Sequence, residues 1–133
     1  MSYYKFISFY LFLILFIHPF FEVDTFTPLA RRVHSSVLVE NKLYFLGGVI
    51  SEAIIIESGS NEVFYLDVSQ QFNIAFPPFI DVTANEKIPF RSSWGTVLLS
   101  DINNEQTIFL FGGYNYDDSI TSPVYTLDLK SGK

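Results

Sequence analysis

The sequence predicts an all-β chain, and three observations support this prediction. The 133 residues include 15 Phe and 8 Tyr, and 49% of the residues are hydrophobic; aromatic and β-branched side chains pack well on pleated surfaces. Apolar runs of roughly four to eight residues alternate with clusters of Asn, Asp, Gly or Ser, as in strands joined by turns. A set of such runs also occurs twice, whereas no segment of about ten or more residues has a helical period.

The first element is an apolar run near the N-terminus, Phe6–Ile17 (FISFYLFLILFI), which His18 and Pro19 end. Its 12 residues match the apolar region of a secretory signal, about 7–15 residues, whereas a membrane span needs about 20. We expect residues 1–21 to be a signal peptide and residues 22–133 to form the domain. No small-x-small cleavage site is visible between Ile17 and Thr27, so a short, uncleaved signal anchor is the alternative. A buried strand or helix is disfavoured because the run is not amphipathic.

The rest of the chain contains an internal repeat, which is the sequence signature of a repeat architecture. The first copy comprises residues Arg31–Val39, Leu43–Gly48 and Val63–Val68, and the second comprises Arg91–Leu99, Ile108–Gly113 and Val124–Leu129. Arg31 and His34 lie 60 residues before Arg91 and Trp94, Gly48 lies 65 before Gly113, and Asp67 lies 61 before Asp128. The differences fall in polar connections, where surface loops tolerate length changes. Glu40-Asn41-Lys42 is expected to be a tight hairpin turn, and residues 101–105 a longer one.

This pattern resembles the kelch repeat. Each copy has Arg-x-x-His or an aromatic residue before its first strand, an aromatic strand that ends in Gly-Gly, and a third strand that ends in Leu-Asp. The resemblance covers Pro28 to the C-terminus and implies β-propeller blades, blade 1 at about 31–80 and blade 2 at about 91–133.

Two features depart from the family. The Trp that usually opens the fourth strand is replaced by Phe72 in the first copy, and the corresponding place in the second is Lys133, the last residue. Propellers have typically 4–8 blades. The resemblance therefore implies about two blades, the second incomplete, in a fragment of a larger propeller that needs further blades or self-association.

Most residues of the repeat have an expected structural role. The double glycines, at 47–48 and 112–113, should allow positive φ and close backbone approach where a strand leaves its sheet. Asp67 and Asp128 should accept hydrogen bonds from turn amides. His34 and Trp94 are expected to share a packing role. The aromatic residues that should fill the space between blades are Tyr44, Phe45, Tyr65, Phe109, Phe111 and Tyr125.

Composition and motifs exclude several functions. The formal net charge is -6 and the 8 Lys and Arg residues are scattered, which argues against nucleic-acid binding. The absence of cysteine rules out disulfides, thiolate metal sites and cysteine nucleophiles. Asp117 and Asp118 with Asn115 lack a calcium loop and are expected to form a solvated acidic loop. Glu52, Glu57 and Glu62 do not form the carboxylate pair of a glycosidase. We expect no catalytic residue, no metal and no cofactor.

The resemblance implies a non-enzymatic binding module for a protein or glycan partner in the secretory pathway. Membrane contact is expected only if the N-terminal segment is uncleaved. Arg31 and Arg91 are the candidate binding residues, because arginine suits carboxylate recognition and in kelch propellers the residue before the first strand can face the partner; an inter-blade hydrogen bond is the alternative role. The alternative function is an N-terminal fragment of a galactose-oxidase-like secreted enzyme. Its copper site and cysteine-linked tyrosine would have to lie outside this chain.

Overall fold

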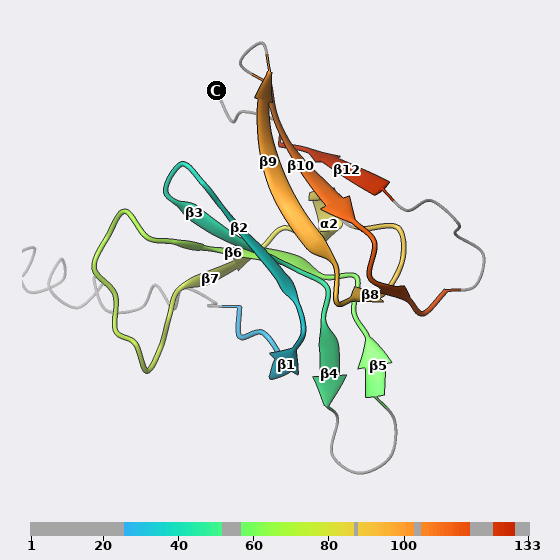
Figure 1. The fold of residues 1–133 in the computed structure, drawn as a ribbon. Coiled ribbons are helices and arrows are strands. Elements are labelled where there is room, and N and C mark those ends of the chain that lie inside the picture. The colour runs from blue at the N-terminus through green and yellow to red at the C-terminus, as the bar shows by residue number, and fades with distance from the viewer. Residues whose placement is uncertain (1–25, 52–56, 87, 103–104, 118–123, 130–133) are drawn as a thin grey trace, which may run out of the picture.

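The computed structural model describes residues 26–51, 57–86, 88–102, 105–117 and 124–129. The expected signal segment, residues 1–21, lies outside the described residues, as do Glu52, Asp118 and Lys133. In the described residues, the chain is predominantly β, as predicted, and consists of antiparallel sheets (Figure 1).

Two larger sheets form the body of the domain. The N-terminal sheet has the strand order β2-β3-β6-β7, and the C-terminal sheet has the order β12-β10-β9. The strands of the N-terminal sheet are β2 (Ser35–Val39), β3 (Lys42–Leu46), β6 (Val63–Asp67) and β7 (Phe79–Asp81). Those of the C-terminal sheet are β9 (Thr96–Ile102), β10 (Glu105–Phe111) and β12 (Val124–Asp128). The first strands of the two sheets, β2 and β9, lie side by side (Figure 1).

Smaller elements lie at the end of the sheets where β2 and β9 begin. One small sheet has the order β1-β4-β5 and the other pairs β8 with β11. Their strands are β1 (Arg31–Arg32), β4 (Val49–Ser51), β5 (Glu57–Gly59), β8 (Ser92–Ser93) and β11 (Tyr114–Asn115). A single helical turn, α2 (Thr83–Glu86), follows β7. No helix among the described residues has the length and apolar character needed to cross a membrane.

The local turn chemistry follows the sequence prediction in part. The longer turn expected at 101–105 is wrong, because β9 extends to Ile102 and β10 begins at Glu105, which pairs with Ile102. Val39 pairs with Lys42, so Glu40 and Asn41 form a two-residue hairpin turn in which Glu40 has φ 52°. All four glycines of the two Gly-Gly pairs have positive φ, between 60° and 101°. The Asp67 carboxylate accepts a hydrogen bond from the Ser69 amide at 2.8 Å, as expected for an Asp that closes a strand. Asp128 instead accepts a hydrogen bond from the Thr107 hydroxyl.

The strand register relates the two copies residue by residue. Val37 pairs with Tyr44 as Leu98 pairs with Phe109, which places the first strands 61 residues apart and the second strands 65 apart. The small sheets agree, because Arg32 pairs with Val49 as Ser93 pairs with Tyr114. We call two residues related in this way counterparts. The counterpart in the second copy has a residue number 61 higher for residues before the first hairpin turn, which include β1 and β2, and for residues of β6. It has a residue number 65 higher for residues of β3, Gly47, Gly48 and β4.

This register corrects the sequence alignment by one residue. The counterpart of Trp94 is Val33, and both have positive φ, 61° and 53°. The counterpart of His34 is Gly95, not Trp94. The expected packing role shared by His34 and Trp94 is wrong, since Trp94 is 71% exposed. In the same way Arg31 is the counterpart of Ser92, and Arg91 that of Ala30.

The hydrophobic core lies between the two larger sheets. Its buried residues come from both sheets and from the segment that joins them: Val39, Tyr44, Leu46, Val63, Ile88, Phe90, Ile108, Leu110 and Leu127. Because side chains alternate along a strand, each sheet also has an outer face, turned away from the other sheet. Tyr44, Tyr65 and Tyr125 contribute to the core as predicted, but Phe45, Phe109 and Phe111 alternate with core residues and lie on the outer faces.

Phe72 does not open the fourth strand as expected. The fourth strand of the N-terminal sheet is β7, which begins at Phe79, so Phe72 lies in the preceding loop. That loop contains Asn73, whose side chain accepts a hydrogen bond from the Ala75 amide at 2.9 Å, and two prolines, Pro77 and Pro78. Such residues favour turns and interrupt strand pairing, which delays the start of β7.

Candidate interaction surface

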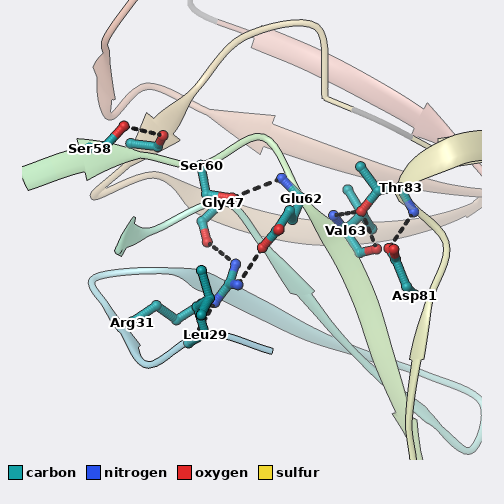
Figure 2. Close-up of polar contacts among 10 residues, drawn as sticks. Leu29, Arg31, Gly47, Ser58, Ser60, Glu62, Val63, Asp81 and Thr83 are labelled. Atoms are coloured by element: carbon teal, nitrogen blue, oxygen red, sulfur yellow. Dashed lines mark hydrogen bonds and ion pairs between the residues drawn. The ribbon is translucent and has the colours of Figure 1, made fainter. Parts of the chain in front are cut away.

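Arg31 is held inside the molecule. Its Nη1 donates to the carbonyl of Gly47 at 3.1 Å and its Nε to the carbonyl of Leu29 at 3.2 Å, while Nη2 forms an ion pair with Glu62 (Figure 2). The guanidinium carbon lies 4.7 Å from the centre of the Phe64 ring, within the range of a cation–π contact. Only 5% of the Arg31 side chain is exposed. These contacts fasten β1 to the N-terminal sheet and leave the guanidinium little surface for a partner.

Arg91 lies on the surface and is held by one carboxylate. Its Nε and Nη2 donate to Oδ1 of Asp117 at 3.0 and 2.8 Å, and its backbone amide donates to Oδ2 at 2.7 Å. Asn115 in turn accepts a hydrogen bond from the Asp117 amide at 2.8 Å. The hydrogen bonds from Arg91 lower the pKa of the Asp117 carboxyl below its ordinary value, and the same interaction raises the pKa of Arg91.

Asp117 and Asn115 were expected in a solvated acidic loop. The structure places them at the end of β11, where they orient Arg91. Asp117 therefore orients Arg91, while much of the Arg91 side chain remains exposed.

Trp94, three residues after Arg91 in the chain, is an exposed aromatic residue. Its amide donates to the carbonyl of Val33 at 2.9 Å, which links the segment before β9 to the segment before β2. A tryptophan in the left-handed region is unusual, because its Cβ crowds the backbone there. The structure holds the indole at the surface at the cost of this backbone conformation.

Two tyrosines, Tyr114 in β11 and Tyr116 just after it, lie next to each other. The rings of Tyr114 and Tyr116 meet edge to face at 4.7 Å, and the Tyr116 hydroxyl lies 3.2 Å from the Ser93 hydroxyl. A Cβ on Gly59 would lie 2.1 Å from the Tyr116 ring, so this ring packs directly on the β5 backbone. Tyr116 thereby fixes β11 against the first small sheet.

His34 lies at the surface, just before β2. Its ring packs against Phe45 at 5.5 Å, and partial burial and the nearby Arg31 charge lower its pKa. The described residues contain no group of three or more His, Cys, Asp or Glu side chains that could hold a metal ion.

One cavity of about 320 Å³ lies away from this surface. Its walls carry no titratable side chain and consist of Thr27, Pro28, Ala75, Phe76, Pro77 and Phe79. It offers shape and apolar contact but no acid, base or metal ligand.

The site residues predicted from the sequence are thus not brought together. Arg31 is buried beside Glu62, whereas Arg91 lies on the surface with Asp117, and Trp94 is exposed three residues farther along the chain. We call Arg91, Trp94 and Asp117 the Arg91 surface. The sequence analysis missed Trp94 as a surface residue because it aligned Trp94 with His34. The neighbours of Trp94, two serines and a glycine, were the signal that could have indicated an exposed position.

No protein-family model matches the chain, and no curated protein matches its sequence.

Proposed function

We propose that the chain forms kelch-type β-propeller blades and acts as a non-enzymatic binding module for a protein or glycan partner in the secretory pathway. Several features support the blade assignment. The N-terminal sheet is a four-stranded antiparallel meander, the next sheet repeats its first three strands, and their first strands are neighbours. The repeated Gly-Gly turns stand at matching positions in both sheets.

The observation that carries the binding proposal is the exposed indole of Trp94, which lies three residues along the chain from the exposed, Asp117-bound Arg91. The left-handed backbone also occurs at the counterpart Val33 and so belongs to the repeat; what distinguishes Trp94 is the exposure of its indole. Trp and Arg are also the residues most enriched among those that dominate binding energies. The indole supplies an apolar platform, and the guanidinium donates hydrogen bonds to carboxylate or hydroxyl oxygens. This combination suits a sugar ring or an acidic peptide side chain.

The proposal can be tested with the full chain produced in a secreting host. The protein is screened on a glycan array and against a set of acidic peptides, and each hit is measured again with Trp94→Asn and Arg91→Ala. Asn tolerates the left-handed conformation, so Trp94→Asn removes the indole without adding strain. Ile74→Ala, which alters an exposed apolar residue elsewhere, is the matched control.

We expect both variants to lose at least tenfold in affinity for the same ligand, while Ile74→Ala binds normally. Arg91→Lys should bind weakly, because a single ammonium cannot keep both hydrogen bonds to Asp117 and also donate to the ligand. A ligand that binds the Trp94→Asn and Arg91→Ala proteins as well as it binds the wild type would overturn the assignment of this surface.

A further inference from the structure

The packing between the two larger sheets predicts what the free face of the C-terminal sheet binds. Tyr44, Leu46 and Val63 of the N-terminal sheet are buried because the C-terminal sheet covers them. Their counterparts lie on the outer face of the C-terminal sheet and are Phe109, Phe111 and Val124. This outer face therefore repeats, strand by strand, a face that is already covered by a sheet elsewhere in the chain.

Exposed apolar residues follow the same correspondence. Tyr114 is 61% exposed, whereas its counterpart Val49 is 2% exposed; Leu29 is 52% exposed, whereas its counterpart Phe90 is 6% exposed. Large exposed apolar side chains are found on both outer faces and at their margins: Leu29 and Leu38 on the N-terminal sheet, and Leu98, Tyr114 and Val124 on the C-terminal sheet. Several large exposed apolar side chains on one side of a sheet are typical of interaction sites.

The outer face of the N-terminal sheet carries the same kind of side chains as the inner face of the C-terminal sheet. The residues with which the C-terminal sheet covers Tyr44 and Leu46 include Ile108, Leu110 and Leu127. Their counterparts on the outer face of the N-terminal sheet are all apolar, namely Leu43, Phe45 and Leu66. Phe26 and Arg31 cover Phe64 on that face, and Leu66 is already buried within the single chain. The accessible part of this outer face therefore lies over β2 and β3, around Leu38.

Polar contacts between the sheets also have counterparts that lie at the surface. The buried Ser35 hydroxyl donates to the carbonyl of Gly95 at 2.7 Å, and it joins β2 to the start of β9. The counterpart of Ser35 is Thr96, which is exposed and also carries a hydroxyl, and the counterpart of Gly95 is His34, which is exposed as well. A second copy can therefore bring the carbonyl of its residue 34 to the Thr96 hydroxyl.

We propose that the outer face of the C-terminal sheet binds the outer face of the N-terminal sheet of a second copy of this chain, head to tail. The contact repeats the packing of the two sheets within one chain and buries Leu98, Phe111 and Val124 against β2 and β3 of the partner copy. Each added copy leaves one face of each kind free. Head-to-tail contacts continue in this way until the rotation closes a ring, and a ring of about 4–8 sheets would need two to four copies. The proposal does not depend on the ligand of the Arg91 surface.

The test uses two variants of the full chain, each blocked on one face. Leu98→Asp places a charge on the outer face of the C-terminal sheet, and Leu38→Asp does so on that of the N-terminal sheet. Both residues are exposed in the single chain, so each variant should fold, which circular dichroism and a thermal melt verify. Ile74→Asp, an equally drastic change in an exposed loop, is the control. Oligomeric state is measured by size-exclusion chromatography with light scattering at micromolar concentration.

We expect oligomers for the wild type and Ile74→Asp, and monomers for Leu98→Asp and Leu38→Asp alone. Mixing the two monomeric variants in equal amounts should produce a dimer, because each still has the face that the other lacks. A folded, monomeric wild-type chain would overturn the proposal and leave the face to a different partner. Folded single variants that stay oligomeric, or a mixture that stays monomeric, would also exclude head-to-tail contact.

Discussion

Gly47 and Gly112 have the same backbone conformation but different surroundings. Their φ angles are 62° and 60°, and they occupy counterpart positions at the ends of β3 and β10. A Cβ on Gly47 would lie 2.6 Å from the carbonyl oxygen of Ser92, whereas a Cβ on Gly112 would meet nothing within 4 Å. The first glycine is thus required by its φ and by a neighbouring sheet, and the second by its φ alone.

This difference predicts unequal effects of alanine at the two positions. Left-handed φ costs an L-residue about 1–2 kcal/mol, so Gly112→Ala should lower the free energy of unfolding by about that amount. Gly47→Ala should cost about 1–3 kcal/mol more, because the methyl group overlaps the Ser92 backbone and forces the sheets apart. Urea unfolding of both variants in the Leu98→Asp background keeps self-association out of the comparison. Equal losses for the two variants would contradict the close approach at Gly47.

The two arginines of the repeat should differ in their contribution to stability. Arg31→Ala removes an almost fully buried guanidinium and leaves the Gly47 carbonyl and the Glu62 carboxylate without it. Breaking a buried pair costs about 3–5 kcal/mol; since Glu62 keeps part of its surface in water, we expect about 3 kcal/mol. Arg91→Ala should leave the thermal midpoint nearly unchanged, because exposed ion pairs contribute little. A thermal midpoint that falls as far for Arg91→Ala as for Arg31→Ala would refute this contrast.

Glu86 should make the stability of the domain depend on pH. Its carboxyl is partly buried beside the core, and Oε2 has no hydrogen-bond partner. Burial raises the pKa of Glu86 above its ordinary 4.5, an effect that the positive charge of Lys42 partly offsets. A folded state with a raised carboxyl pKa binds more protons than the unfolded state, so stability falls as pH rises from the unfolded pKa through the folded one.

Glu86→Gln removes this charge. The variant should melt at a higher temperature than the wild type at pH 7, and the difference should shrink as pH falls below the ordinary carboxyl pKa. Glu40→Gln, which alters an exposed hairpin residue, serves as the control. A Glu86→Gln protein that is less stable than the wild type at pH 7 would show that the carboxylate has a partner that compensates for its burial.

The local elements of this fold could be predicted from the sequence because their causes are local. Alternating apolar residues specify the strands, and Gly47-Gly48 and Gly112-Gly113 specify turns with positive φ. The register between the copies could not be predicted, because strand pairing within each copy makes Val33, and not His34, the counterpart of Trp94, whereas the visible Arg-x-x-aromatic match suggests the reverse. Register depends on which residues pair across strands, and a one-residue shift turns every side chain to the other face.

The candidate site depended on contacts distant in sequence. Glu62 lies 31 residues from Arg31, and Asp117 lies 26 residues from Arg91. Two arginines with similar sequence neighbours thus acquire opposite environments, one buried and one exposed. The difference between the two environments arises from sheet packing, which cannot be predicted from a short sequence motif.

The N-terminal run Phe6–Ile17 is predicted to direct secretion and to be absent from the mature protein, because about 20 residues are needed to span a bilayer. Intact-mass measurement of protein from the culture medium should show a chain that lacks the run. The reverse outcome, a chain that retains residues 1–5 and sediments with membranes, would establish the short anchor instead. Leu13→Arg, which interrupts the run, should keep the protein inside the cell in either case.

The hydroxyls of Ser35 and Thr96 should have different effects when they are removed, although the two residues are counterparts. Ser35→Ala leaves the Gly95 carbonyl without its donor between two packed sheets, so it should lower the free energy of unfolding by about 1–2 kcal/mol. Thr96 lies on the outer face, so Thr96→Val should leave the unfolding of the Leu98→Asp monomer unchanged. In the otherwise wild-type chain, Thr96→Val should weaken self-association several-fold, measured by sedimentation at a series of concentrations. A Thr96→Val chain that associates as tightly as the wild type would show that residue 34 of the second copy does not approach this hydroxyl.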